Sequence, residues 1–250
     1  MPITVHQFPC LSDNYGFLIR DDETGLCACV DTPDADAILA ELSRLGWKLE
    51  LILNTHWHPD HAGGNAQVQA ATGAKSVGPA EVRKIAPLDR EVKGGEEVML
   101  GNTRFAVLET GGHTLGHIAY YAAADHVAFV GDTLFALGCG RLFEGDAAQM
   151  WTSLQTLAAL PDETRVYCAH EYTASNARFA LTVDEGPALK ARAAEVFAAR
   201  ERGEPTVPTT IGMEKATNPF LRAPLLAGAP GRAPHESFGA VRAAKDDFKG

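Results

Sequence analysis

The stretch Thr55-His56-Trp57-His58-Pro59-Asp60-His61 holds three imidazoles and a carboxylate within six positions. His56 and His58 are two residues apart, so on extended backbone both rings point to the same side. Pro59 disfavours helix at His58, and a helix would scatter these polar groups around its circumference. Neutral imidazole suits Zn, Fe and related ions, and carboxylate accepts harder ions. Because burying such groups without partners is costly, the stretch predicts a site for one or two divalent metals rather than a polar loop.

The composition is that of a globular protein with a large core, in one domain or two: 250 residues, 46% hydrophobic and 22% charged. No apolar run approaches the length of a membrane span. Residues 1–6 lack the basic-then-apolar pattern of a signal peptide. The cysteines lack paired zinc-knuckle spacing, so we interpret them as reduced, buried thiols of a cytoplasmic protein; they are Cys10, Cys27, Cys29, Cys139 and Cys168.

The formal net charge of −10 argues against a nucleic acid as the main substrate. Binding to phosphates needs clustered Lys and Arg side chains. A local basic patch is still compatible with an acidic protein. We expect a small-molecule substrate, with neither a nucleic-acid nor a membrane partner.

Short β-like runs recur in the first two-thirds of the chain, at residues 16–20, 26–30, 49–53, 104–108, 117–121, 126–130 and 165–168. Helical patterns lie between them, one following Asp34 and ending at Gly46, another following Asp146. This alternation predicts an α/β protein with mixed sheets covered by helices.

The β-like runs stop after about residue 172. An Ala-rich helical segment opens at Pro187. A Pro/Gly-containing stretch over residues 203–234 is expected to bridge from it to a last helix near residues 236–249. We therefore predict a metal-binding domain over residues 1–171 and a small helical domain over residues 172–250.

Three more ligand-type side chains follow predicted strands, namely His113, Asp132 and His170. Glycines precede the first two and allow the sharp turns that expose a ligand. Each alone is more often structural, but their occurrence beside the 56–61 stretch favours a common metal site. His117 is a rival ligand if its segment is helical, although Gly112 and Gly116 argue against that. Asp31 ends a strand and could either orient a ligand imidazole or cap a turn.

The series His56-x-His58-x-Asp60-His61, followed by His113, Asp132 and His170, resembles the metallo-β-lactamase superfamily. The resemblance implies an αββα sandwich that binds metal at one edge. It also implies a first ion held by three histidines, a second held by an aspartate and two histidines, and a bridging carboxylate. In that order, these ligands would be His56, His58 and His113; Asp60, His61 and His170; and Asp132. Seven ligands suit two ions better than one tetrahedral ion, and we expect Zn, with Fe or Mn as alternatives.

Further motifs resemble a narrower family, glyoxalase II or hydroxyacylglutathione hydrolase. They are Asp13-Asn14-Tyr15, Gly131-Asp132-Thr133-Leu134-Phe135, Gly138-Cys139-Gly140-Arg141-Leu142-Phe143-Glu144-Gly145, His170-Glu171-Tyr172-Thr173, Asn218-Pro219-Phe220-Leu221-Arg222 and Val241-Arg242-Ala243-Ala244-Lys245-Asp246-Asp247-Phe248. The resemblance implies hydrolysis of S-D-lactoylglutathione and similar 2-hydroxyacylglutathiones to a 2-hydroxy acid and glutathione, the second step of methylglyoxal detoxification. A metal-bridging hydroxide would attack the thioester, with Asp60 and Asp132 as the catalytic residues.

The same resemblance implies six glutathione contacts: Arg141, Phe143, Tyr172, Asn176, Arg242 and Lys245. Cationic side chains can pair with the carboxylates of the tripeptide. Some family members carry Lys and Tyr where this chain has Arg141 and Phe143. Arginine keeps the charge, but Phe143 cannot donate a hydroxyl, and a lost hydrogen bond costs about 1 kcal/mol.

Other functions are compatible with part of this pattern. A dimetal phosphodiesterase or nuclease of the same fold would need a basic surface, and a mono-iron persulfide dioxygenase would leave part of the ligand set unused. A non-catalytic metal-binding protein would be expected to lose a ligand such as Asp60. We interpret Cys139 as structural because no basic partner is assigned to it. We expect the protein to be a monomer that acts on a glutathione thioester.

Overall fold

The computed structural model describes residues 3–226 and 231–250. Residues 1–2 of the N-terminal segment and residues 227–230 of the predicted Pro/Gly stretch lie outside the described residues. The chain divides into two compact units. The N-terminal unit comprises Met1–Glu109 and Gly116–Gly131, and the C-terminal unit comprises Thr110–Leu115 and Asp132–Gly250.

The N-terminal unit contains a mixed sheet with strands in chain order, from β1 to β6. The strands are β1 (Ile3–Cys10), β2 (Asn14–Asp21), β3 (Cys27–Val30), β4 (Leu49–Leu53), β5 (Lys75–Gly78) and β6 (Arg90–Glu91). The first three pair antiparallel, and β3 to β6 pair parallel. Parallel neighbours need crossover connections, and these carry the helices of this unit.

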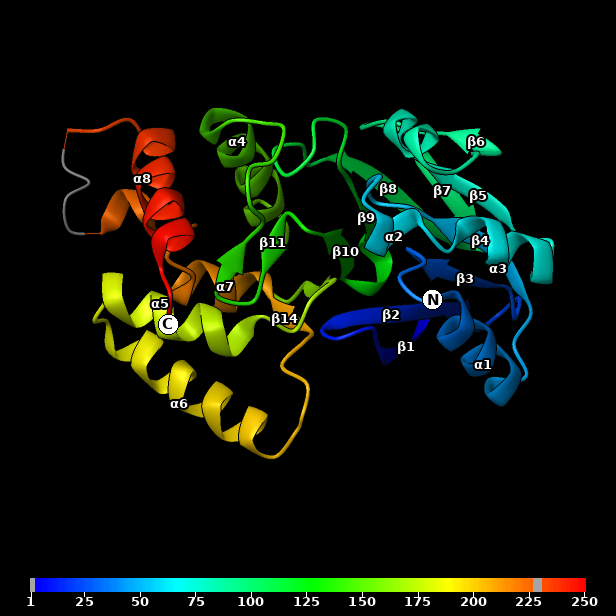
Figure 1. The fold of residues 1–250 in the computed structure, drawn as a ribbon, viewed down its shortest axis with the longest axis horizontal. Coiled ribbons are helices and arrows are strands. Elements are labelled where there is room, and N and C mark those ends of the chain that lie inside the picture. The colour runs from blue at the N-terminus through cyan, green and yellow to red at the C-terminus, as the bar shows by residue number, and fades with distance from the viewer. Residues whose placement is uncertain (1–2, 227–230) are drawn as a thin grey trace. The chain divides into compact units, whose positions relative to one another are not determined.

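Two helices, α1 (Ala35–Leu45) and α3 (Asn65–Thr72), cover one face of this sheet (Figure 1). As predicted, Asp34 caps the start of α1 by accepting from the Ala37 backbone N–H, and Gly46 ends it in the left-handed conformation. Their apolar sides form a buried cluster with the facing strand residues, among them Leu18, Cys29, Ile38, Leu42 and Val68. All five cysteines are buried, free thiols, as the sequence predicted.

A second sheet of the N-terminal unit has neighbouring strands in the order β10-β9-β8-β7, all antiparallel. They are β7 (Glu97–Leu100), β8 (Thr103–Glu109), β9 (Ile118–Ala122) and β10 (Val127–Gly131). The two sheets pack face to face: the rings of Phe17 and Phe129 lie 5.6 Å apart, and the buried Tyr120 hydroxyl donates to the Asn54 carbonyl at 2.9 Å. Hence the core of this unit lies between two sheets.

The C-terminal unit is mostly helical. A hairpin of β11 (Leu134–Phe135) and β12 (Gly138–Cys139) precedes α4 (Ala147–Ala158), and β13 (Arg165–Cys168) pairs with β14 (Thr209–Thr210). The remaining helices are α5 (Thr173–Val183), α6 (Pro187–Glu201), α7 (Ile211–Thr217) and α8 (Pro234–Asp247). Helices α5 and α6 lie side by side (Figure 1). Asp146 caps α4 by accepting from Gln149, as predicted.

Two expectations about the last third of the chain are wrong. Strand β14 lies beyond residue 172, because two residues that pair with β13 need no strand pattern of their own. Helix α7 lies inside the stretch that we expected to be a bridge, where the Thr210 hydroxyl caps it. In residues 3–226 and 231–250, no helix is long and apolar enough to cross a membrane.

Candidate metal centre

The histidine-rich stretch follows β4, next to the end of the parallel strand β3. Asp31 follows β3, is buried, and has a left-handed backbone with φ of 57°, which is rare outside glycine. Its carboxylate accepts from the Thr55 backbone N–H and the Thr55 hydroxyl, both at 2.7 Å. The same carboxylate also makes a hydrogen bond to the His61 ring, whose Nδ1 lies 2.8 Å from Asp31 Oδ2. Asp31 therefore lies against the start and the end of the 55–61 stretch.

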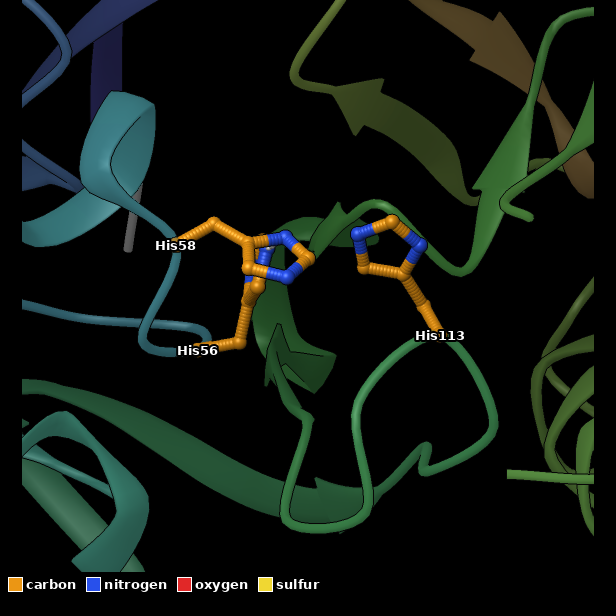
Figure 2. A group of neighbouring side chains, drawn as sticks. All are labelled: His56, His58 and His113. Atoms are coloured by element: carbon orange, nitrogen blue, oxygen red, sulfur yellow. Dashed lines mark hydrogen bonds between the residues drawn. The ribbon is translucent and has the colours of Figure 1, made fainter. Parts of the chain in front are cut away.

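These contacts assign the protons of two imidazoles. His61 Nδ1 donates to Asp31, which leaves the lone pair of His61 Nε2 for a metal. The Thr55 hydroxyl donates to Asp31, so its oxygen accepts from His56 Nδ1 at 3.0 Å. The lone pair of His56 is then on Nε2, which lies 3.1 Å from His58 Nδ1. Figure 2 shows the His56 and His58 rings, which come from one loop.

Asp60 and His61 lie on a short helix, α2 (Pro59–Ala62), whose N-cap is His58. His58 has the expected extended backbone, with φ of −58° and ψ of 149°. The expectation of a non-helical backbone is wrong for Asp60 and His61, which lie in α2. Proline restricts the residue before it to extended conformations and is itself favoured in the first helical turn. The turn brings Asp60 Oδ2 to 3.6 Å from His61 Nε2, and Asn14 donates to the same carboxylate oxygen at 3.1 Å.

The C-terminal unit brings His113, Asp132 and His170 together, and all three are buried. Asp132 Oδ2 lies 3.4 Å from His113 Nε2, and Asp132 Oδ1 lies 3.4 Å from His170 Nε2. Each carboxylate oxygen of Asp132 thus faces a different imidazole.

The His113 side chain, labelled in Figure 2, projects from the loop at residues 110–115. Its Nδ1 donates to the Arg141 carbonyl at 2.8 Å, which leaves Nε2 for a metal. Gly140 precedes Arg141 in the chain. A Cβ atom at this position would overlap the Asp132 carbonyl oxygen. Glycine at this position allows the chain to pass close to both His113 and Asp132.

The side chains expected to contact glutathione fall into two groups, exposed and buried. Phe143 is 63% exposed and Tyr172 is 37% exposed, while the Arg141 side chain is 65% exposed. Tyr172 stacks on the His170 ring with centroids 4.6 Å apart. These three side chains therefore face solvent over part of their surface, and Arg141 Nε lies 3.7 Å from Asp246 Oδ1.

Asn176 and Arg242 are buried, and each donates to a backbone carbonyl. The Asn176 amide donates to the Ala136 carbonyl at 3.1 Å. Arg242 donates to the Cys139 carbonyl at 2.9 Å and to Asp246 at 3.0 Å. These contacts join α5 and α8 to the β11–β12 hairpin.

Lys245 is half-buried beside the Ser175 hydroxyl, 3.1 Å from its Nζ. Burial, together with the charges of Arg242 and Arg141, lowers the pKa of Lys245 to about 8. By contrast, burial raises the pKa of the Cys139 thiol to about 11. Cys139 stays protonated at neutral pH, which supports its interpretation as structural.

Sequence reasoning missed three partners of these groups. Asn14 belongs to the quoted Asp13-Asn14-Tyr15 motif, which was the available signal for its contact with Asp60. Thr55 opens the histidine stretch, but nothing in the spacing indicated its contacts with Asp31 and His56. The sequence indicates His117 only as a rival ligand, whereas in the structure it is buried and stacks on the His56 ring, with centroids 4.7 Å apart.

Comparison with known proteins identifies the family. A model described as the metallo-beta-lactamase superfamily matches residues 29–170, and one described as the hydroxyacylglutathione hydrolase C-terminus matches residues 171–248. A hydroxyacylglutathione hydrolase of Erythrobacter litoralis is 54% identical over 250 residues, covering 98% of this chain and 100% of the relative.

Solved structures have the same fold. ETHE1 from Myxococcus xanthus has a TM-score of 0.70 at 29% identity, over 96% of this chain and 90% of that one. TTHA1623 in a di-iron-bound form has a TM-score of 0.63 at 26% identity, over 87% of this chain and 100% of that one. The His and Asp ligands of this fold suit two metal ions. The predicted metallo-β-lactamase fold with a helical C-terminal region is confirmed, and the chain belongs to the hydroxyacylglutathione hydrolase family of that superfamily.

Proposed function

We propose that this protein hydrolyses the thioester of 2-hydroxyacylglutathiones, with S-D-lactoylglutathione as the main substrate. Water supplies the hydroxyl that joins the acyl carbon, the carbon–sulfur bond breaks, and glutathione leaves as a thiolate that takes up a proton. The observation that carries the proposal is similarity along the whole chain to an enzyme of that name. The same similarity disfavours the phosphodiesterase and persulfide dioxygenase alternatives.

For the metals, we propose a first ion on His56, His58 and His113 and a second on Asp60, His61 and His170, with Asp132 shared. Three imidazoles support this because their Nδ1–H groups donate to protein oxygens and leave Nε2 as the ligand atom. The donors suit Zn, which we propose, or Fe or Mn. When bound, the ions would lower the pKa of water and polarise the thioester carbonyl.

For the substrate, we propose that Arg141 and Lys245 pair with glutathione carboxylates and that Tyr172 and Phe143 contact the tripeptide. Charge-assisted hydrogen bonds to carboxylates are about twice as strong as neutral ones. We propose that Asn176 and Arg242 support this surface through the backbone they contact. The metal ligands would then all lie in residues 1–171, and residues 172–250 would add Tyr172 and Lys245 to the glutathione site.

We also propose that the enzyme acts in the cytoplasm as a monomer, on a small molecule and without nucleic-acid or membrane partners. The net charge of −10 and the five buried thiols support this setting.

The test is a thiol-release assay with S-D-lactoylglutathione on protein loaded separately with Zn, Fe or Mn. We expect release with at least one metal, and none from Asp60→Ala protein that keeps the wild-type circular dichroism spectrum. Asp36→Ala, at an exposed position on α1, is the matched control and should hydrolyse normally. Lack of release under all three metals, or normal turnover by Asp60→Ala, would refute the proposal.

A further inference from the structure

The β11–β12 hairpin connects two of the proposed ligands in the C-terminal unit. It begins two residues after Asp132 and leads through Gly140 to Arg141. The Gly140 backbone N–H donates to the Thr133 carbonyl at 3.3 Å, and the Arg141 carbonyl accepts from His113 Nδ1. A shift of the hairpin would therefore move Asp132 at one end and the support of His113 at the other.

The turn of this hairpin is buried and has an unusual conformation. Leu137 is fully buried and has a left-handed φ of 57°. Leucine is disfavoured there, because its Cβ crowds the backbone, so such a turn persists only where its surroundings hold it. Leu137 packs in a cluster with α5 and α6 side chains, including Ala177, Leu189 and Ala193.

Side chains of the helical region bind the hairpin backbone at four successive residues. Glu214 accepts from the Leu137 N–H at 2.9 Å, and Asn176 donates to the Ala136 carbonyl. The Asn218 amide donates to the Phe135 and Gly138 carbonyls at 3.2 and 2.9 Å. Gly138 has to be small, because a Cβ would overlap the Asn176 amide. The turn is thus fixed by polar groups that lie far away in sequence.

Glu214 is the centre of this arrangement and is completely buried. Its Oε2 atom accepts from Leu137 N and from Asn218 Nδ2, each at 2.9 Å. Its Oε1 atom pairs with the Arg192 guanidinium and accepts from the Thr209 hydroxyl at 2.6 Å. One carboxylate oxygen thus binds the hairpin and Asn218, and the other binds the Arg192 guanidinium and the Thr209 hydroxyl.

We infer that Glu214 and Asn218 are positioning residues for the reaction: they hold the Leu134–Cys139 hairpin and thereby set where Asp132 and His113 lie. Neither residue needs to touch substrate or metal. The inference rests on the proposed function for its kinetic consequences, but its effect on metal binding can be measured without substrate. Residues that orient metal ligands typically change metal affinity or activity by ~10–100-fold when replaced.

Two substitutions break the hold on the hairpin. Glu214→Gln keeps the size but has one acceptor oxygen, so its NH2 group must face either Leu137 N–H and Asn218 or the Arg192 guanidinium. Asn218→Ala removes the donor to both hairpin carbonyls. We expect each variant to bind zinc at least ~10-fold more weakly in chelator competition. We also expect faster hydrogen exchange at the Leu137 amide, and a kcat loss larger than any rise in KM.

Two matched controls separate positioning from loss of stability. Thr209→Val removes the hydrogen bond to the other oxygen of Glu214 and the one that Thr209 accepts from Arg192, without touching the hairpin. Asp21→Asn changes a buried carboxylate of the N-terminal unit that also accepts several hydrogen bonds. We expect both to lower the melting temperature while zinc affinity, Leu137 exchange and kcat stay at wild-type values.

The outcomes distinguish the two proposals. Wild-type zinc affinity in folded Glu214→Gln and Asn218→Ala protein would overturn the positioning role, and so would equal loss of affinity in Thr209→Val. If the wild type bound zinc but released no thiol, the proposed function would fail, while weaker zinc binding by the hairpin variants would still support positioning. If one of Glu214→Gln and Asn218→Ala fails to fold, hydrogen exchange at the Leu137 amide is measured in the variant that folds. Faster exchange there supports the positioning role, and wild-type exchange overturns it.

Discussion

Asp31→Asn should damage the metal centre by moving protons on two histidines. The amide can keep its oxygen toward the Thr55 backbone N–H, but its NH2 group then faces the Thr55 hydroxyl and His61 Nδ1, where Asp31 Oδ2 now accepts two hydrogen bonds. His61 Nδ1 would have to accept, which puts its proton on Nε2. The Thr55 hydroxyl would turn to donate to His56 Nδ1, with the same result. Both proposed ligand atoms would be blocked.

The expected loss is ~10–100-fold in zinc affinity, equivalent to about 1.4–2.7 kcal/mol, for each ion whose imidazole changes tautomer. Zinc binding is measured by chelator competition, with zinc content after dialysis as a second readout. Thr55→Val separates the two effects, because it removes the partner of His56 while Asp31 still accepts from His61. Asp36→Asn, on the exposed side of α1, is the control for an amide substitution. Wild-type affinity for two zinc ions in Asp31→Asn would refute the tautomer argument.

Three further predictions concern substrate binding and acid stability. With a pKa lowered to about 8 by burial and nearby arginines, Lys245 should lose its charge between pH 7 and 9. KM for the anionic substrate should therefore rise over that range with little change in kcat, whereas Lys245→Arg should flatten the rise. Arg141→Ala should raise KM up to ~5-fold, because an exposed ion pair contributes about 1 kcal/mol. Phe143→Tyr should lower KM ~5-fold, because a gained hydrogen bond also contributes about 1 kcal/mol. If steady-state kinetics show no change in either variant, these residues do not belong to the glutathione site. Burial alone would raise the pKa of Asp21, but hydrogen bonds from Thr24, Thr103 and Asn102 lower it from 3.8 to about 2. The lowered pKa of Asp21 contributes at most about 2 kcal/mol to the free energy of unfolding, and this contribution should be present above pH 4 and lost as the pH falls toward 2. In urea unfolding, the difference in unfolding free energy between wild type and Asp21→Asn should therefore shrink over that range. A difference that stays constant with pH contradicts this.

Elements with a local pattern were predictable from the sequence. Helix α1 has a capping aspartate and a terminal glycine, and β4 and β13 are apolar runs with the predicted bounds. The density of ligand types at residues 56–61 indicated a metal site for the same reason, because chemistry and spacing are both local. Helix α2 was missed because one helical turn carries no periodicity.

Features set by distant contacts were not predictable. Strand β14 exists because β13 pairs with it. The left-handed turn at Leu137 is held by Glu214, 77 positions away. From the sequence, a single glutamate in a helical segment is predicted to lie on the surface, because charged side chains are rarely buried. Its role depends on which backbone group it meets, and spacing along the chain does not contain that information.

The six residues Thr110–Leu115 belong to the C-terminal unit although the chain on both sides of them belongs to the N-terminal one. Within the C-terminal unit they supply the Thr110 carbonyl that accepts from Thr133 and the Gly111 carbonyl that accepts from Ser153. They also carry His113. A fragment starting at Asp132 would lack these acceptors and one of its three proposed ligands. No single cut of the chain therefore yields two intact units, and a gene that gained or lost the C-terminal unit by fusion at residue 131 would have had to rebuild this loop as well.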